Sequence, residues 1–195
     1  PALGLGVERP EPDIMDKPPR ASKKPLIDKG LLWRSFGWLG MIEAVLCYFG
    51  FFLVIFGSGN LGIFFPILSG LKVPAFLFSP MSVYAAYAIA NTVYHAGVVS
   101  SQIGNAFACR TETSHNTAMG WFSNKYLWAG IGIELLIIAL LIYVPFLAGI
   151  FNHVEIPVYF WPGLLMYAVV LYCLEWIRKF ISRRLSRKQD SSLVS

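Results

Sequence analysis

The sequence predicts an all-α membrane protein in which four helices cross the bilayer and both termini lie in the cytoplasm. Three observations predict this fold. The 195-residue chain is 56% hydrophobic and only 14% charged, which leaves more apolar surface than a soluble domain of this size can bury. The apolar residues form four continuous runs. All but one of the 16 Lys and Arg residues lie near the two ends of the chain or in its central connection.

Each apolar run is long enough for a helix across the hydrocarbon core, which takes about 20 residues. Backbone amides in lipid must be hydrogen-bonded within their own segment, and the runs do not alternate apolar with polar residues, so helices are favoured over a barrel. We expect spans near residues 33–56, 82–108, 126–146 and 158–180.

The basic residues predict the orientation. Only Lys72 lies in the connections that would face outside, so the positive-inside tendency places both termini and the Arg110–Lys125 connection in the cytoplasm. The expected organisation is an N-terminal segment over 1–30, a membrane domain over 31–182 and a basic, polar tail over 183–195. We expect the end of this tail to lack regular structure.

The second apolar run is the most polar of the four. Asn91, His95, Gln102 and Asn105 are spaced so that they share a narrow wedge of one helix face. Polar groups at membrane depth are costly unless they face protein, water or an ion. The spacing alone leaves two interpretations open, an ion pathway or hydrogen bonding between helices, and His95 by itself favours packing.

Small residues recur at every fourth position of the same run. This spacing lets helices approach closely, so we expect a central helix packed on several sides. The residues are Ala88, Thr92, Ala96, Ser100, Gly104 and Ala108.

Acidic residues lie within other runs. Glu134 is about 13 Å of helix from the start of the third run, and a transmembrane acid at such depth commonly marks a cation or proton pathway. Glu43 has fewer polar neighbours on its helix, so we interpret it as structural. Glu175 precedes Arg178 and Lys179 by three and four residues, which predicts a local ion pair.

Motifs for chemistry on bound groups are absent from the sequence. It has no Gly-rich phosphate loop, no nucleophile motif and no Cys/His spacing typical of a metal site. We therefore expect no cofactor in this chain. The basic residues after the fourth run favour anionic lipid at the cytoplasmic face over nucleic acid as a partner.

Short segments spread over nearly the whole chain resemble the type II cation-transporting P-type ATPases. The opening residues Pro1–Arg20 are similar to the sequence that leaves the sixth transmembrane helix of these pumps. The other similar segments correspond to the eighth helix and its exit, the two ends of the ninth helix and the end of the tenth: Asn91–Tyr94, Gln102–Glu112, Phe122–Lys125, Tyr143–Pro145 and Leu174–Lys179.

The resemblance implies roles for particular residues. In this family the position of Gln102 helps to hold a transported cation, and in sodium/potassium-type pumps the positions of Asn105 and Glu134 contribute to an additional ion site. Asn105 departs from that pattern, because those pumps carry Asp there. Gln102, Asn105 and Glu134 are the ion-pathway candidates, and Asn91, His95 and Glu43 are secondary pathway candidates. Of these, Gln102 and Glu134 are the residues that could contact a transported cation directly.

The resemblance also implies what the chain works with. It corresponds to helices seven to ten, so the other transport helices and the phosphorylation domain would be its partners, and Mg-ATP would be used only by the full-length pump. We expect no ATPase activity from this chain alone, and a plasma-membrane location. The alternatives are a self-standing small oligomeric transporter or channel, and a truncated regulatory partner of a full-length pump.

Overall fold

The computed structural model consists of helices and irregular connections in the residues that it describes, with no strand among them. These residues are 1–10, 15, 25, 27–60, 81–111 and 120–193, with side chains described to residue 185. Most of the proline-rich opening loop, and residues 61–80 of the predicted outer connection, lie outside them.

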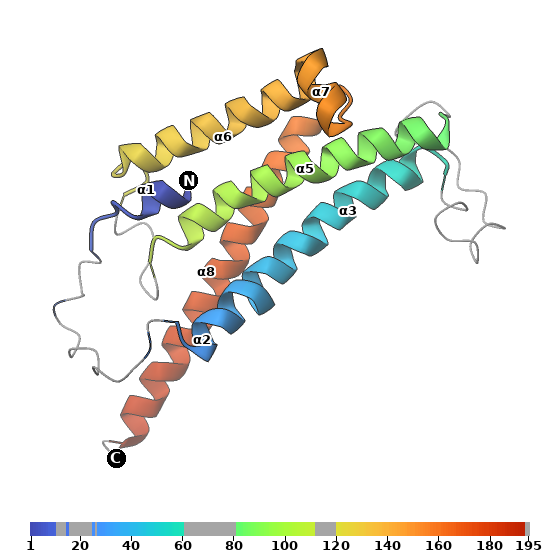
Figure 1. Cartoon of the computed structure of the whole chain (residues 1–195). Helices are drawn as coiled ribbons and strands as arrows, with labels where there is room; N and C mark the ends of the chain where they lie inside the picture. Colours follow the sequence, from blue (N-terminus) through green and yellow to red (C-terminus); the bar gives the residue numbers. More distant parts are fainter. Residues whose placement is uncertain (11–14, 16–24, 26, 61–80, 112–119, 194–195) are drawn as a thin grey trace. The chain divides into compact units, whose positions relative to one another are not determined.

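Four long helical stretches account for most of the chain, and Figure 1 labels their parts. The first stretch, Lys29–Gly57, is continuous although its hydrogen-bonding pattern changes along its length. In chain order the elements are α1 (Ala2–Leu5), α2 (Lys29–Leu32), η2 (Trp33–Gly40), α3 (Met41–Gly57), α5 (Val83–Ala108), α6 (Lys125–Tyr143), α7 (Pro145–Phe151) and α8 (Phe160–Leu193).

Three of these stretches are long and apolar enough to cross a membrane. They are Lys29–Gly57, Lys125–Tyr143 and Phe160–Leu185. Helix α5 has the length to cross but is not among them, because its polar residues lower its mean hydropathy. A membrane protein with three candidate spans is thus established, and a crossing by α5 stays a prediction.

Two predicted boundaries differ from the structure. Helix α6 ends at Tyr143, because Val144 is extended (φ −90°, ψ 113°) ahead of Pro145. A proline disfavours the α conformation in the residue before it, and Pro145 then starts the separate helix α7. Helix α8 continues to Leu193. The tail after residue 183 is therefore helical over most of its length, and the expectation of irregular structure was wrong there; Arg, Lys, Gln and Leu are good helix formers.

The segment η2 is a π-helix of 8 residues within the first stretch. Gly37 permits close packing here, since a Cβ at this position would lie 2.6 Å from Cε3 of Trp33. No sequence pattern predicts a π-helix. Such segments are rare and are found frequently at functional sites.

The chain forms two compact units, and we describe each by itself. The first unit comprises residues 1–42, 102–133 and 168–195, and the second comprises residues 43–101 and 134–167. Helices α5, α6 and α8 therefore contribute residues to both.

The second unit has the larger apolar core. Parts of α3, α5, α6 and α8 meet there, together with Ile156 from the connection between α7 and α8. The fully buried members include Val54, Ile55, Ala86, Ala90, Val93, Ala96, Ile138, Ile142 and Leu164. Tyr167 lies close to two glycines of this unit, and a Cβ on Gly50 would overlap its hydroxyl group.

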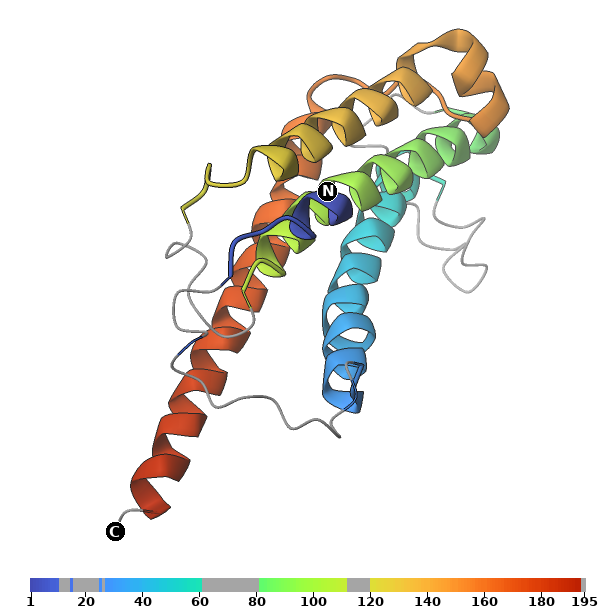
Figure 2. The same ribbon diagram turned by 60° about the vertical axis from the view of Figure 1, so that its left-hand side comes forward.

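In the first unit, backbone segments approach each other closely at two glycines. A Cβ on Gly104 of α5 would overlap the backbone of Ala168 in α8, so these helices are in direct backbone contact. Gly4 of α1 packs in the same way on Leu127 of α6, where a Cβ would lie 2.7 Å from Cα. Figures 1 and 2 both show α1 beside the start of α6. The small apolar cluster here is Leu39, Ala108 and Leu171.

The predicted small-residue face of α5 is confirmed as a packing face. Ala88, Thr92, Ala96, Ser100 and Ala108 are each no more than 3% exposed, and Gly104 is buried as well. Small side chains at a helix interface let backbones approach closely, which is the observed use of this stripe.

Candidate functional site

The predicted ion-pathway residues of α5 lie on a face that this chain covers only in part. Asn91, Gln102 and Asn105 are half-buried and His95 is exposed. The adjoining small-residue face is buried. The polar wedge is therefore less covered than its neighbour, although polar groups at membrane depth need protein, water or an ion beside them.

Gln102 and Asn105 belong to the same unit and lie one helical turn apart. The side-chain oxygen of Asn105 accepts a hydrogen bond of 3.4 Å from the thiol of Cys109. An amide with one oxygen and two donors has further capacity, so this bond leaves room for an additional partner.

Glu134 lies on the buried face of α6. Its neighbours one turn away, Ile131 and Ile138, are 4% and 3% exposed. Its atom Oε2 is buried and has no hydrogen-bond partner among the residues that the structure describes. An uncompensated carboxylate oxygen in an apolar span is costly, and bound cations or protons are the usual means of compensation. Glu43 is half-buried in the first turn of α3.

The candidates divide between the two units. Gln102 and Asn105 are in the first, whereas Glu134 is in the second together with the secondary candidates Asn91, His95 and Glu43. Within the described parts of the chain, no group of three or more His, Cys, Asp or Glu side chains could hold a metal ion. The assignment of these residues to one pathway stays a prediction.

Sequence reasoning missed a partly buried cluster that joins three segments, which we call the Arg110 cluster (Glu8, Arg110, Ser123 and Asn124). Arg110 Nε and Nη2 donate to the two carboxylate oxygens of Glu8 over 3.0 and 2.9 Å. Arg110 also donates to Ser123 Oγ over 2.6 Å and to the carbonyl of Gly120 over 2.9 Å. A bidentate pair of this geometry is among the stronger hydrogen-bonded contacts in proteins.

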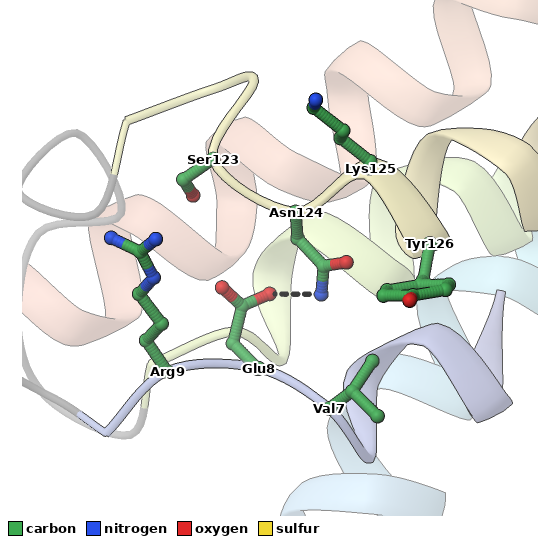
Figure 3. A pocket seen from close by; sticks show the side chains of 7 residues that line it. All are labelled: Val7, Glu8, Arg9, Ser123, Asn124, Lys125 and Tyr126. Carbon is green, nitrogen blue, oxygen red and sulfur yellow. Dashed lines mark hydrogen bonds between the residues drawn. The ribbon is translucent and has the colours of Figure 1, made fainter.

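Asn124 completes the Arg110 cluster from the start of α6. Its Nδ2 donates to Glu8 over 2.9 Å, drawn as a dashed line in Figure 3, and to the carbonyl of Gly4 over 2.8 Å. Its Oδ1 accepts from the backbone of Leu127 over 3.0 Å, which caps the helix. One side chain thereby ties α1 and the residues after it to the first turn of α6.

The electrostatics of Glu8 follow from these contacts. Burial raises the pKa of this carboxyl, but hydrogen bonds from Arg110 and Asn124 and the charge of Arg110 outweigh burial and hold the pKa below its ordinary value. A pocket of about 280 Å³ opens beside it, lined by Val7, Glu8, Arg9, Ser123, Asn124, Lys125 and Tyr126 (Figure 3).

A second charged cluster involves α8. The side chain of Glu175 is 1% exposed, and both of its oxygens accept hydrogen bonds of 2.7 Å from Arg178, as the spacing predicted. One of these oxygens also accepts a hydrogen bond of 2.9 Å from Arg34 of η2. The contacts described for the Lys179 side chain are with backbone and with Thr111, and its charge also acts on Glu175. Its Nζ donates to the carbonyls of Ala108 and Thr111 over 2.7 and 2.8 Å, where it satisfies backbone groups at the end of α5.

Both clusters connect helices to neighbouring segments, and neither is suited to acid–base or nucleophilic catalysis. Their carboxylates are occupied by Arg side chains, so neither offers a free base or a nucleophile. They fix the ends of α5, α6 and α8 relative to the segments that enter the first unit. The long-range pairs Glu8–Arg110 and Arg34–Glu175 connect residues more than 100 positions apart, for which the sequence carries no local signal.

Comparison with known proteins identifies the protein family of this chain. Residues 1–181 match the family described as "Cation transporting ATPase, C-terminus". The chain belongs to this family. The resemblance seen in the short sequence motifs is thereby confirmed, and the chain is a C-terminal region of the P-type cation ATPase kind.

Curated relatives include pumps for different ions. The chain is 26% identical over 199 residues to the sodium/potassium-transporting ATPase subunit alpha-4 of Rattus norvegicus, covering 94% of this chain and 19% of that protein. It is 25% identical to the alpha-2 subunit of Homo sapiens over the same shares. It is 25% identical over 195 residues to calcium-transporting ATPase 1 of Yarrowia lipolytica, covering all of this chain and 18% of that protein. The chain thus spans about a fifth of the length of these relatives.

Proposed function

We propose that this chain is the C-terminal membrane module of an ATP-driven cation pump. In the whole pump it supports the transport helices and contributes Gln102, Asn105 and Glu134 to an ion or proton pathway. The match of residues 1–181 to the C-terminal region of cation-transporting ATPases carries the proposal. Mg-ATP binding and phosphoryl transfer belong to parts of the pump outside this chain.

The state of Glu134 supports its role in the pathway. A buried carboxylate oxygen without a described partner is unusual, since buried polar groups are nearly always satisfied. A structural acid would be expected to resemble Glu175, whose two oxygens are both taken by Arg side chains. A transported cation or a proton is the compensation that fits the family.

The partly covered polar wedge of α5 supports a partner beside it. Asn91, Gln102 and Asn105 are only half-buried here, while the relatives have about four-fifths of their length outside the matched region. We propose that transport helices from that remainder pack on this wedge. Gln102 would then face the cation site, and Asn105 would supply a neutral amide at the additional site.

The topology that we propose has four crossings, by Lys29–Gly57, α5, α6 and α8, with both termini in the cytoplasm. The uneven distribution of basic residues supports it. Arg178, Arg183 and Arg184 near the end of α8 would attract anionic lipid at the cytoplasmic face. We propose the plasma membrane as the location.

The test uses the full-length protein that carries this chain. Glu134→Gln and Gln102→Ala, made separately, should express normally and shift the cation concentration for half-maximal ATPase activity by about tenfold, the effect of losing one good polar ligand. Glu155→Gln is the matched control, because it removes an exposed carboxylate outside the candidate spans.

Two results would count against the proposal in different ways. Normal expression of both variants with wild-type cation dependence would remove these residues from the pathway. A full-length protein that lacks any nucleotide-dependent transport would favour the alternatives, a small self-standing transporter or a regulatory partner of another pump.

A further inference from the structure

Two histidines meet in the second unit. His95 Nδ1 on α5 lies 2.6 Å from Nε2 of His153, which is in the connection between α7 and α8. The rings are arranged edge to face, with centroids 4.9 Å apart. His95 is exposed and His153 is 7% exposed. A sequence separation of 58 residues hides this pair from pattern analysis.

The connection that carries His153 docks on α5 through few polar contacts. The backbone amide of Val154 donates to Oγ1 of Thr92 over 3.0 Å. The carbonyl of Ile156 accepts from the hydroxyl of Tyr143 over 3.1 Å, and the Ile156 side chain enters the apolar core. The histidine contact and the Val154 bond are thus the polar contacts described between this connection and α5, and only the first depends on protonation.

An imidazole pair at 2.6 Å can hold only a limited number of protons. One facing nitrogen must carry the hydrogen and the other must present a lone pair, so at least one ring has to be neutral at that atom. When both rings are protonated, two N–H groups and two positive charges face each other. The contact then becomes repulsive.

The contacts described around the two imidazoles provide no bonded counter-charge to offset this repulsion; Glu43 of α3 acts on the neighbouring Tyr94. Among the residues described, no carboxylate bonds to either imidazole. On the side of His95, the ring centroid of Tyr94 lies 6.0 Å from that of the imidazole, and Tyr48 of α3 packs on Tyr94. On the other side, the ring of Phe151 stacks on His153, and Glu155 is exposed. Burial lowers the pKa of His153, and the charge of His95 lowers it further.

We propose that His95 and His153 form a proton-operated latch, which holds residues 152–156 against α5 while one imidazole is neutral and releases them when both are protonated. Because the pKa of His153 is lowered in the docked state, the released state binds protons more readily. The equilibrium constant for docking is therefore largest above the ordinary imidazole pKa of about 6.5, and it falls by up to tenfold for each pH unit below that value.

The latch lies on the helix that carries Gln102 and Asn105, so release would change how the middle of α5 is held. On the topology proposed above, the connection faces outside the cell, and external acidity would operate the latch. This last step rests on the proposed function, whereas the latch itself does not.

Hydrogen–deuterium exchange of the full-length protein in lipid nanodiscs tests the latch. The reporter is the amide of Val154, compared at pH 7.5 and 5.5 with labelling times scaled to the intrinsic exchange rate. In the wild type, the protection factor of the Val154 amide should be about tenfold lower at pH 5.5 than at pH 7.5. His95→Gln should flatten this response, because an amide side chain can donate to neutral His153 or accept from its protonated form.

Matched variants make the outcome decisive. Glu155→Gln alters charge on the same connection and should keep the wild-type response, and Thr92→Val should remove protection at both pH values. Equal wild-type protection at the two pH values would overturn the proposal. So would an unchanged response in His95→Gln, or a response lost in Glu155→Gln.

Discussion

Breaking the Arg110 cluster should destabilise the first unit by an amount that its geometry allows us to estimate. The side chain of Arg110 is 1% exposed and that of Glu8 is 10% exposed. Arg110→Ala leaves the carboxylate with the Asn124 bond but without its buried counter-charge. Removing one partner of a buried pair costs about 3–5 kcal/mol. Because Glu8 keeps some access to water, we expect about 3 kcal/mol.

A double-mutant cycle separates the pair from the other contacts of each residue. Glu8→Ala and Arg110→Ala should each lower the thermal unfolding midpoint of this 195-residue chain by about 6–12 °C, from roughly 2–4 °C for each kcal/mol. The double variant should cost about 4 kcal/mol instead of the additive 6 kcal/mol or so, which corresponds to a coupling of about 2 kcal/mol. Arg9→Ala is the control, since Arg9 is exposed on the same segment and its loss should cost less than about 0.5 kcal/mol.

The acid dependence of the same effect provides a second check. The pKa of Glu8 is lowered in the folded protein, so the pair stabilises fully above the ordinary value of 4.5 and loses its effect as the pH falls through the lowered pKa. The difference between wild type and Glu8→Ala should be constant near pH 7 and shrink below pH 4.5. Additive single mutations, or a difference that grows with acidity, would refute the reasoning.

Further variants test packing, capping and activity. Gly104→Val should lower the free energy of unfolding by about 1–3 kcal/mol or more, and with it the unfolding midpoint, because the new side chain overlaps the backbone of Ala168. Gly132→Ala is the control: nothing lies within 4 Å of its Cβ, so it should be neutral or stabilising. Lys179→Met should cost about 1–3 kcal/mol in the same assay, since the carbonyl of Thr111 loses a buried donor; an unchanged midpoint would contradict that role. The isolated chain should form no acid-stable phosphoenzyme with ATP, and vanadate-sensitive turnover above a mock preparation would disprove this expectation.

The helical character of the chain was predictable because it rests on local physics. An apolar run in lipid has to satisfy its own backbone, so the composition and run length alone indicate helices. The small-residue stripe of α5 was predictable for a similar reason, since a spacing of four residues defines one helix face. Single-residue effects set the ends of helices, as at Pro145, where the missing amide hydrogen and the ring stop α6 earlier than hydropathy suggests.

The contacts that join distant segments were not predictable. The pair Glu175–Arg178 lies within one helical turn and was found, whereas Arg34 reaches the same carboxylate from 141 residues away. Neither Arg34 nor His153 belongs to a motif. A charged or titratable side chain in a span needs a partner, but the sequence does not say which one, because the choice depends on how helices pack.

The polar residues of α5 show how the two kinds of information combine. Sequence spacing places Gln102 and Asn105 on one wedge, and burial shows that this chain packs on the neighbouring small-residue face instead. A helix that buries its small face and leaves its amides partly covered is suited to a boundary between two parts of a membrane protein. The relatives extend far beyond the matched region, and we propose that the remainder of the pump packs on these amides. A boundary of this kind would account for the lower mean hydropathy of α5 compared with the three candidate spans, because a helix enclosed by protein has no need to match lipid on every side.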